Sequence, residues 1–165
     1  WEADEVTAPD DSLLLPTGEP AWFGEGLRFR CTGCGQCCTG SSGSVNLTRA
    51  DVARLAEHLG LKPATFTREY TRRHNGRRVL VNRSSGSQCV FLKNNACTVY
   101  DARPVQCRTY PWWLANIQDE ESWQEAAKGC EGIGHPSAKL VPAAQIIEKC
   151  SIDIENDAVI VDERG

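Results

Sequence analysis

Four of the nine cysteines in the chain fall within eight residues, at Cys31, Cys34, Cys37 and Cys38. Cysteines three residues apart on a tight loop can turn their sulfurs towards one metal centre, at metal–sulfur distances of about 2.3 Å. A disulfide between the adjacent Cys37 and Cys38 would be strained, and an odd number of cysteines argues against a complete disulfide framework. The spacing therefore predicts a thiolate metal site in a reducing compartment.

The spacing of Cys31, Cys34 and Cys37 matches the run that holds three corners of a [4Fe–4S] cluster in bacterial-type ferredoxins. That run ends in Cys-Pro and this one does not, so the chain is not a ferredoxin. Gly33 and Gly35 give the backbone the freedom to bring amide N–H groups towards the sulfurs. Thiolates suit both iron and zinc. We expect an iron–sulfur cluster, with [4Fe–4S] favoured, and zinc as the alternative.

The other cysteines lie further along the chain. Cys89 and Cys97 flank a predicted hairpin, and Cys107 and Cys130 bracket an aromatic segment. Cys150 is expected to be a buried small hydrophobic residue, outside the site. Eight thiols would fill two four-thiolate centres, or one centre with structural thiols to spare. The candidate metal ligands are Cys31, Cys34, Cys37, Cys38, Cys89, Cys97, Cys107 and Cys130.

Charged and aromatic residues surround Cys107 in the sequence. Arg103 and Arg108 could compensate the negative charge of a thiolate centre, or they could form ordinary surface ion pairs. Adjacent residues of an extended segment face opposite ways. We therefore expect one of Trp112 and Trp113 to be buried and the other exposed, as a candidate partner contact. The pair could equally shield the cluster from water.

These motifs together resemble the CxxCxxCC cysteine-cluster family of zinc- or iron-chelating domains, over Phe29 to Ile133. The resemblance rests on Phe29 to Cys38, Leu47-Thr48 with Asp51, Cys89 to Leu92, Cys97 with Tyr100, Arg103-Pro104, Cys107-Arg108, Tyr110-Pro111 and Cys130 with Gly132. A bacterial flagellin lysine N-methylase carries a similar cluster, which implies that the cluster can be iron–sulfur and can support methyl transfer. No Gly-rich strand–turn–helix segment that would hold S-adenosylmethionine is evident in the sequence. Whether the chain is an enzyme stays open, and no residue is assigned a catalytic role.

The remaining pattern predicts a small, irregular α+β domain organised by its metal, with a few short helices and a short β-hairpin. Thr48 and Asp51 resemble a capping box, apolar residues follow at helical spacing, and Gly60 suits the end of that helix. Further helices are expected over 63–71, 119–128 and 142–149, and strands over 45–47, 77–82, 89–92, 97–100 and 158–161. The basic run at 72–78 is expected to be a solvated turn, with binding of phosphate or an acidic partner as the alternative.

The chain divides by composition into an acidic N-terminal tail or strap (1–20), a cysteine-cluster domain (21–133) and a C-terminal extension (134–165) that packs on the domain or on a partner. The net charge of −4 argues against nucleic-acid binding, and no apolar run is long enough to predict a transmembrane span. Because the sequence lacks Met and opens on Trp1, either a leader was removed or only part of the chain is given. Reduced thiols predict cytoplasm, plastid stroma or mitochondrial matrix.

The sequence therefore predicts a metal-binding protein with a cysteine-ligated iron–sulfur cluster or zinc, redox-active or supporting a protein partner. The partner would contact the exposed tryptophan or the terminal segments. The alternative is a non-catalytic interaction or assembly subunit stabilised by structural zinc, in which the metal replaces part of a hydrophobic core.

Overall fold

A computed structural model describes residues 13–33, 45–82, 88–94 and 96–162 of the 165-residue chain. It confirms the mixed α+β class, with short helices and short antiparallel strand pairs. The helices are α1 (Arg49–Leu59), α2 (Pro63–Tyr70), the 3-10 helix η3 (Tyr100–Ala102), α3 (Val105–Thr109), α4 (Leu114–Ile117), α5 (Glu120–Lys128) and α6 (Ala143–Asp162). The strands are β1 (Leu27–Arg28), β2 (Thr71–His74), β3 (Arg77–Leu80), β4 (Leu92–Lys93), β5 (Ala96–Cys97) and β6 (Leu140–Val141).

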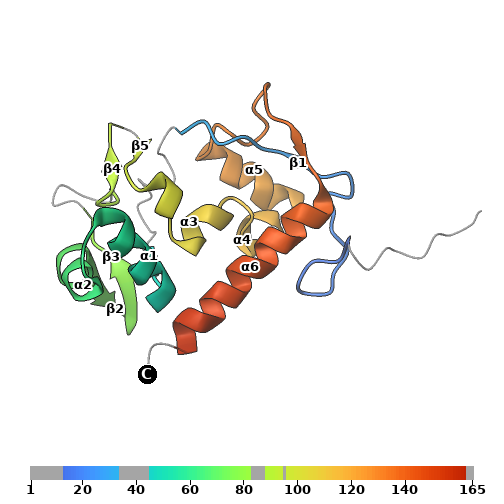
Figure 1. Cartoon of the computed structure of the whole chain (residues 1–165). Coiled ribbons are helices and arrows are strands. Elements are labelled where there is room, and N and C mark those ends of the chain that lie inside the picture. The colour runs from blue at the N-terminus through green and yellow to red at the C-terminus, as the bar shows by residue number, and fades with distance from the viewer. Residues whose placement is uncertain (1–12, 34–44, 83–87, 95, 163–165) are drawn as a thin grey trace, which may run out of the picture.

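The elements gather around two hydrophobic clusters. Figure 1 shows α1, α2 and the β2–β3 and β4–β5 hairpins on one side, β1 and α5 on the other, and α6 running diagonally below α3 and α4. One cluster is built from Leu15, Phe23, Leu27, Trp112, Ile117, Trp123, Ala143, Ile146 and Cys150. The other is built from Leu47, Val52, Leu55, Ala56, Phe66, Leu80, Phe91, Val99 and Ala102. Helix α3 lies between the two sides and packs on α6.

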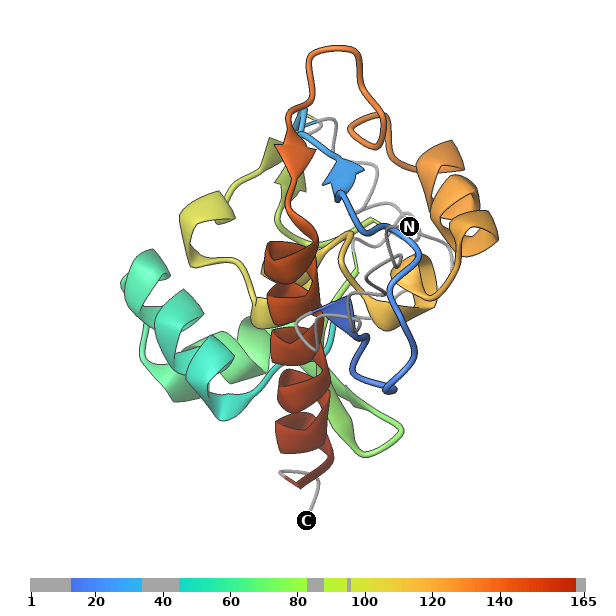
Figure 2. The same ribbon diagram turned by 90° about the vertical axis from the view of Figure 1, so that its right-hand side faces the viewer.

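Strand β1 joins the early part of the chain to its late part. Leu27 pairs with Val141 in the antiparallel β1–β6 ladder, and Figure 2 shows the two strands side by side at the start of α6. Gly26 adopts a φ of 105°, and a Cβ there would lie 2.0 Å from the carbonyl oxygen of Val141. The close approach of the two backbones therefore requires glycine at this position.

The predicted helix after Thr48 is confirmed as α1. The Thr48 hydroxyl accepts a hydrogen bond from the Asp51 amide, and the Asp51 carboxylate accepts one from the Thr48 amide, so the capping box is complete. Gly60 ends the helix with a left-handed φ of 69°, as glycine does at many helix ends. Val52, Leu55 and their buried neighbour Ala56 face the second cluster. The local sequence signals and the packing agree here.

The basic run is a strand pair rather than the solvated turn that we expected. The second helix ends at Tyr70, and β2 begins at once and pairs with β3 through Thr71↔Leu80 to His74↔Arg77. Asn75 and Gly76 have φ values of 51° and 75°, the conformation that a two-residue hairpin turn requires.

The predicted strand over 158–161 is wrong, because α6 continues through it to Asp162. Ala143, Ile146 and Cys150 follow one another at helical spacing and are buried, so tertiary packing holds this segment as one long helix. The hairpin predicted around Cys89 to Tyr100 is present, with shorter strands that pair Leu92 with Cys97. None of the helices in the described ranges is both long enough and apolar enough to cross a membrane.

Candidate metal centre

Three predicted ligands from distant parts of the chain line the same cavity. Cys31 follows β1, Cys107 lies on α3, and Cys130 follows α5. Together they line a cavity of about 160 Å³. Cys31 is exposed, and Cys107 and Cys130 are half-buried. The fold therefore brings together thiols that are separated by up to 99 residues, between Cys31 and Cys130.

Backbone pairing holds the segment of Cys31 against the segment of Cys130. The Arg30 amide donates to the Gly132 carbonyl at 3.0 Å, and the Gly134 amide donates to the Arg28 carbonyl at 2.9 Å. Phe29 and Ile133 form an antiparallel bridge between these two bonds. The Thr32 hydroxyl also donates to the Glu131 carboxylate.

Gly132 permits this approach, because a Cβ at that position would lie 2.1 Å from the Arg30 carbonyl oxygen. In the sequence, Gly132 was noted only as part of the family resemblance, and no structural role was predicted for it.

A buried carboxylate fixes the start of α3, the helix that carries Cys107. Asp51 is fully buried, and its Oδ1 accepts hydrogen bonds from the Val105 amide at 3.2 Å and from Arg54 Nη2 at 2.6 Å. Arg54 Nη2 in turn donates to the Arg103 carbonyl at 3.0 Å. The sequence identified Asp51 only as a helix cap. Its second role depends on contacts across more than fifty residues, which no local pattern reveals.

Aromatic side chains form the apolar wall of the cavity. The Trp112 ring stacks on Trp123 with centroids 5.3 Å apart, and it meets Phe29 edge-on at 5.4 Å. Trp112 and Phe29 both line the cavity. Trp112 is buried, whereas Trp113 is half-buried rather than exposed as expected of one of the pair. The Trp113 indole N–H donates to the Gln106 carbonyl and to the Thr109 hydroxyl, both at 3.1 Å. These contacts hold the ring against α3.

The cavity also has a positive rim. Arg103 and Arg108 line it, and Arg103 lies 3.8 Å from the centre of the Tyr100 ring, in a cation–π contact. Burial, followed by the neighbouring charge of Arg54, lowers the pKa of Arg108. Guanidinium groups placed this close together favour a negative charge beside them. Thiolate ligands carry such a charge.

The other cysteines occupy different places. Cys89 and Cys97 are half-buried against the second hydrophobic cluster, around the β4–β5 hairpin. The segment that carries Cys31 is described as far as Gly33, and both views place its end beside this hairpin (Figures 1 and 2). Gly33 and Tyr100 line the same cavity as Cys31, Cys107 and Cys130. Cys34, Cys37 and Cys38 lie outside the described residues.

Cys150 is fully buried within the first cluster. Burial, and then the charge of Asp153, raise the pKa of its thiol to about 11. A thiol with so high a pKa is a poor metal ligand at neutral pH.

Within residues 13–33, 45–82, 88–94 and 96–162, no three His, Cys, Asp or Glu side chains are close enough to hold a metal ion by themselves. The three cysteines thus line the cavity without forming a complete ligand set among the described residues. Thiol donors, flanking arginines and an aromatic wall are nevertheless surroundings that suit a thiolate-bound metal.

The sequence model of the CxxCxxCC family, described as "Putative zinc- or iron-chelating domain", matches residues 30–131. This range is more than half of the chain, and the chain belongs to this family. It contains Cys31, Cys107 and Cys130, so all three cysteines of the cavity fall in the matched region. No solved structure matches the fold.

Proposed function

We propose that the chain carries a cysteine-ligated iron–sulfur cluster, most simply [4Fe–4S], and that Cys31, Cys107 and Cys130 are among its ligands. The observation that carries the proposal is the convergence of these three thiols on one cavity. Cys31, Cys34 and Cys37 have the spacing of a cluster-binding run, and Cys38 adjoins them in the sequence. In this proposal one of Cys34, Cys37 and Cys38 supplies the fourth thiolate. The other two, with Cys89 and Cys97, form a second four-thiolate centre or are structural thiols.

The size of the cavity favours a cluster over one ion, and the charge of its rim suits any four-thiolate centre. A volume of about 160 Å³ is roughly five times the 30 Å³ share of one molecule in liquid water. A four-thiolate centre is negatively charged, and Arg103 and Arg108 stand at the cavity to offset that charge. Trp112 and Phe29 exclude water from the other side, which tunes the potential of such centres.

A bound cluster of this kind supplies one-electron redox chemistry. The residues of the chain would hold it close to the surface, because Cys31 and Thr32 are exposed and Tyr100 is 46% exposed. A protein partner that exchanges electrons would approach at this exposed edge rather than at Trp113. The chemistry requires reduced cysteines, and therefore a reducing compartment.

The test is metal and sulfide analysis, with an absorbance spectrum, on protein purified without air. The proposal expects iron and sulfide in matching amounts and a broad visible band. Serine variants of Cys31, Cys107 and Cys130 should each lose most of the iron, whereas Cys150→Ser should retain it. Equal iron loss in the Cys150 variant, or no iron after anaerobic reconstitution, would contradict the proposal.

A structural zinc site in an interaction subunit is the second candidate, and one observation favours it. The three cysteines come from segments far apart in the chain, so a metal between them would cross-link the fold. Stoichiometric zinc in a colourless protein that unfolds on chelation and shows no redox response would establish this function instead of the first.

A further inference from the structure

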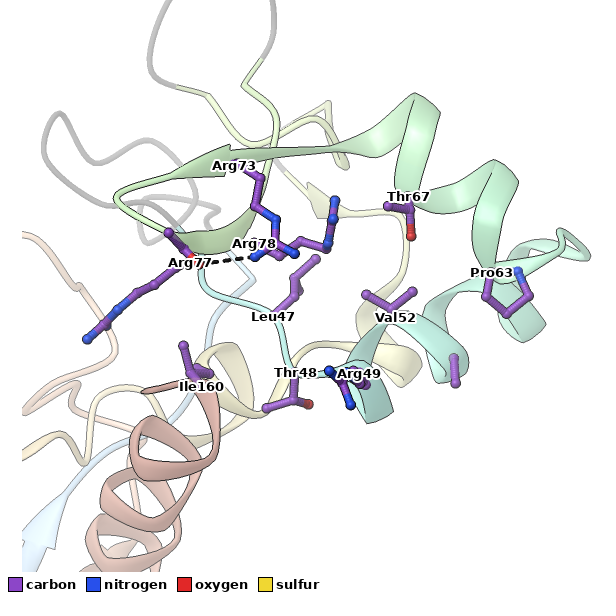
Figure 3. Close-up of a pocket in the computed structure, with 12 residues that line it drawn as sticks. Leu47, Thr48, Arg49, Val52, Pro63, Thr67, Arg73, Arg77, Arg78 and Ile160 are labelled. Carbon is purple, nitrogen blue, oxygen red and sulfur yellow. Dashed lines mark hydrogen bonds between the residues drawn. The ribbon is translucent and has the colours of Figure 1, made fainter. Parts of the chain in front are cut away.

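A second cavity, of about 320 Å³, lies between α1, the β2–β3 hairpin and the end of α6 (Figure 3). Its charged lining residues are Arg49, Arg73, Arg77 and Arg78, and neither Asp nor Glu lines it among the described residues. The chain as a whole has a net charge of −4. The cavity is therefore a local concentration of positive charge on an acidic protein.

Two of the arginines are directly opposed across the hairpin. Arg73 pairs with Arg78 in the β2–β3 register, so both side chains lie on the same face of the ladder. Like charges in this position are unfavourable unless something offsets them. Within the described chain their guanidinium groups donate hydrogen bonds to uncharged acceptors: Arg73 donates to the Gly76 carbonyl at 3.1 Å, and Arg78 donates to the Thr71 hydroxyl at 2.7 Å.

The pKa of Arg78 is lowered by burial and then by the charge of Arg73, which reflects the same crowding. Arg77 differs from this pair, because it forms an ion pair with Asp157 at 3.1 Å and points away from the cavity in Figure 3.

The opposite wall adds positive potential and an apolar surface. Thr48 and Arg49 stand at the N-terminus of α1, the positive end of the helix dipole. Leu47, Val52 and Ile160 supply apolar lining. The cavity thus offers arginines that can bind an anionic group, and an apolar surface that can contact the rest of the same ligand.

We propose that this cavity binds the phosphate group of a small soluble phosphomonoester. A phosphate group carries a charge of about −1.5 to −2 at pH 7 and three acceptor oxygens, which suits guanidinium groups that come from two sides of a cavity. A carboxylate, by comparison, can be bound through both of its oxygens by a single guanidinium group, so it gains less from several arginines than a phosphate does. The volume lies at the lower end of the roughly 300–1,000 Å³ of small-molecule sites, and a recess of this size fits a small molecule better than a bilayer surface or a nucleic-acid duplex.

Calorimetric titration of the full chain with glycerol 3-phosphate, inorganic phosphate and acetate at fixed ionic strength tests this proposal. Both phosphates should bind saturably with one site per chain, and acetate at least about tenfold more weakly. Arg73→Gln should raise the Kd for glycerol 3-phosphate by roughly tenfold or more. Arg72→Gln is the matched control, because the exposed Arg72 precedes Arg73 on the same strand and does not line the cavity. It should leave the Kd unchanged.

Arg78→Gln removes the bond to Thr71 and could disturb the hairpin, so Arg49→Gln on the opposite wall is the second variant. Circular dichroism confirms that each variant is folded, and Arg49→Gln should also weaken binding. Equal weakening by Arg72→Gln and Arg73→Gln would overturn the proposal, because it would mean general surface attraction. Acetate binding as tightly as phosphate would overturn it too. So would binding to vesicles of phosphatidylcholine and phosphatidic acid without binding to glycerol 3-phosphate.

Discussion

Replacing Gly132 with alanine should disrupt both the fold and the metal centre. Gly132 lies where the backbone segment next to Cys130 packs against the segment next to Cys31. The new Cβ would lie 2.1 Å from the Arg30 carbonyl oxygen, whereas ordinary van der Waals contact begins near 3.4 Å. The two segments must therefore separate by about 1.3 Å. The 3.0 Å hydrogen bond from the Arg30 amide to the Gly132 carbonyl would be lost with that movement.

The cost follows from these two effects. Overpacking of a well-packed site costs about 1–3 kcal/mol, and a lost hydrogen bond costs about 0.5–1.5 kcal/mol. We expect Gly132→Ala to lower the free energy of unfolding by about 2–4 kcal/mol, or the melting temperature by roughly 4–16 °C for a chain of this size. Metal–ligand distances in protein sites lie within about 0.2 Å of their usual values, so a movement of this size should lower the metal content as well.

Urea unfolding and metal analysis of the two glycine variants, prepared side by side, check this prediction. Gly129→Ala is the control, because Gly129 directly precedes Cys130 and its new Cβ would meet its nearest atom, the Ala126 carbonyl oxygen, at an ordinary 3.9 Å. This variant should keep both its stability and its metal. If Gly132→Ala stays within about 0.5 kcal/mol of the parent chain and retains its metal, the close approach does not exist as described. Equal damage in both variants would place the cause at the end of α5.

Three further predictions concern other parts of the molecule. Asp51→Ala should lower the free energy of unfolding by about 2–4 kcal/mol in urea titrations, because the half-buried amide of Val105 and the α1 cap lose their acceptor. The control Glu57→Ala, at an exposed position of the same helix, should cost little. Stability should fall as pH rises from about 9 to about 11, because the Cys150 thiol keeps its proton in the fold up to a pKa of about 11 while the unfolded chain releases it near 9. Cys150→Ala should flatten that part of the pH profile, and an unchanged slope would refute the assignment. Removing the metal with a chelator should lower the melting temperature, because metal binding contributes to folding, and an identical melting curve would argue against a metal that cross-links the fold.

Local chemistry made α1 predictable, and longer-range packing explains the errors. The capping box and Gly60 lie within one short stretch, so the sequence contains everything that defines this helix. The segment 158–161 consists of Ala-Val-Ile-Val, which favours a strand by intrinsic preference, yet it continues a helix whose earlier turns are held by Ile146 and Cys150. Propensity is a weak guide where neighbouring turns already pack on the core.

The β2 strand was missed for a different reason. Its residues Arg72 to His74 are basic and lack the alternating apolar pattern of a strand. Asn75-Gly76 is nevertheless a strong hairpin signal, and it was available in the sequence. A run of charge does not exclude a strand when the turn residues favour one.

The sequence predicts the ligand types of the candidate metal site but not which of the cysteines lie together. Cysteine spacing identified the first loop, and the count of eight candidate thiols, Cys150 left aside, brought Cys107 and Cys130 into the ligand set. That these two share a cavity with Cys31 depends on the pairing of Arg30 with Gly132 and on the link from Asp51 to Val105. Such contacts join residues that no local pattern relates, so only the folded structure shows which cysteines meet.

The pairing of β1 with β6 limits how far the chain can be truncated without losing part of the fold. Trp112, which walls the cysteine cavity, belongs to a core that also contains Leu15 and Phe23 from before the family-matched range and Ile146 and Cys150 from after it. A fragment trimmed to residues 30–131 would keep the three cysteines and lose that half of the core, together with the whole β1–β6 ladder. The stretch of sequence that defines the family is therefore shorter than the cooperative unit that must fold to present its cysteines.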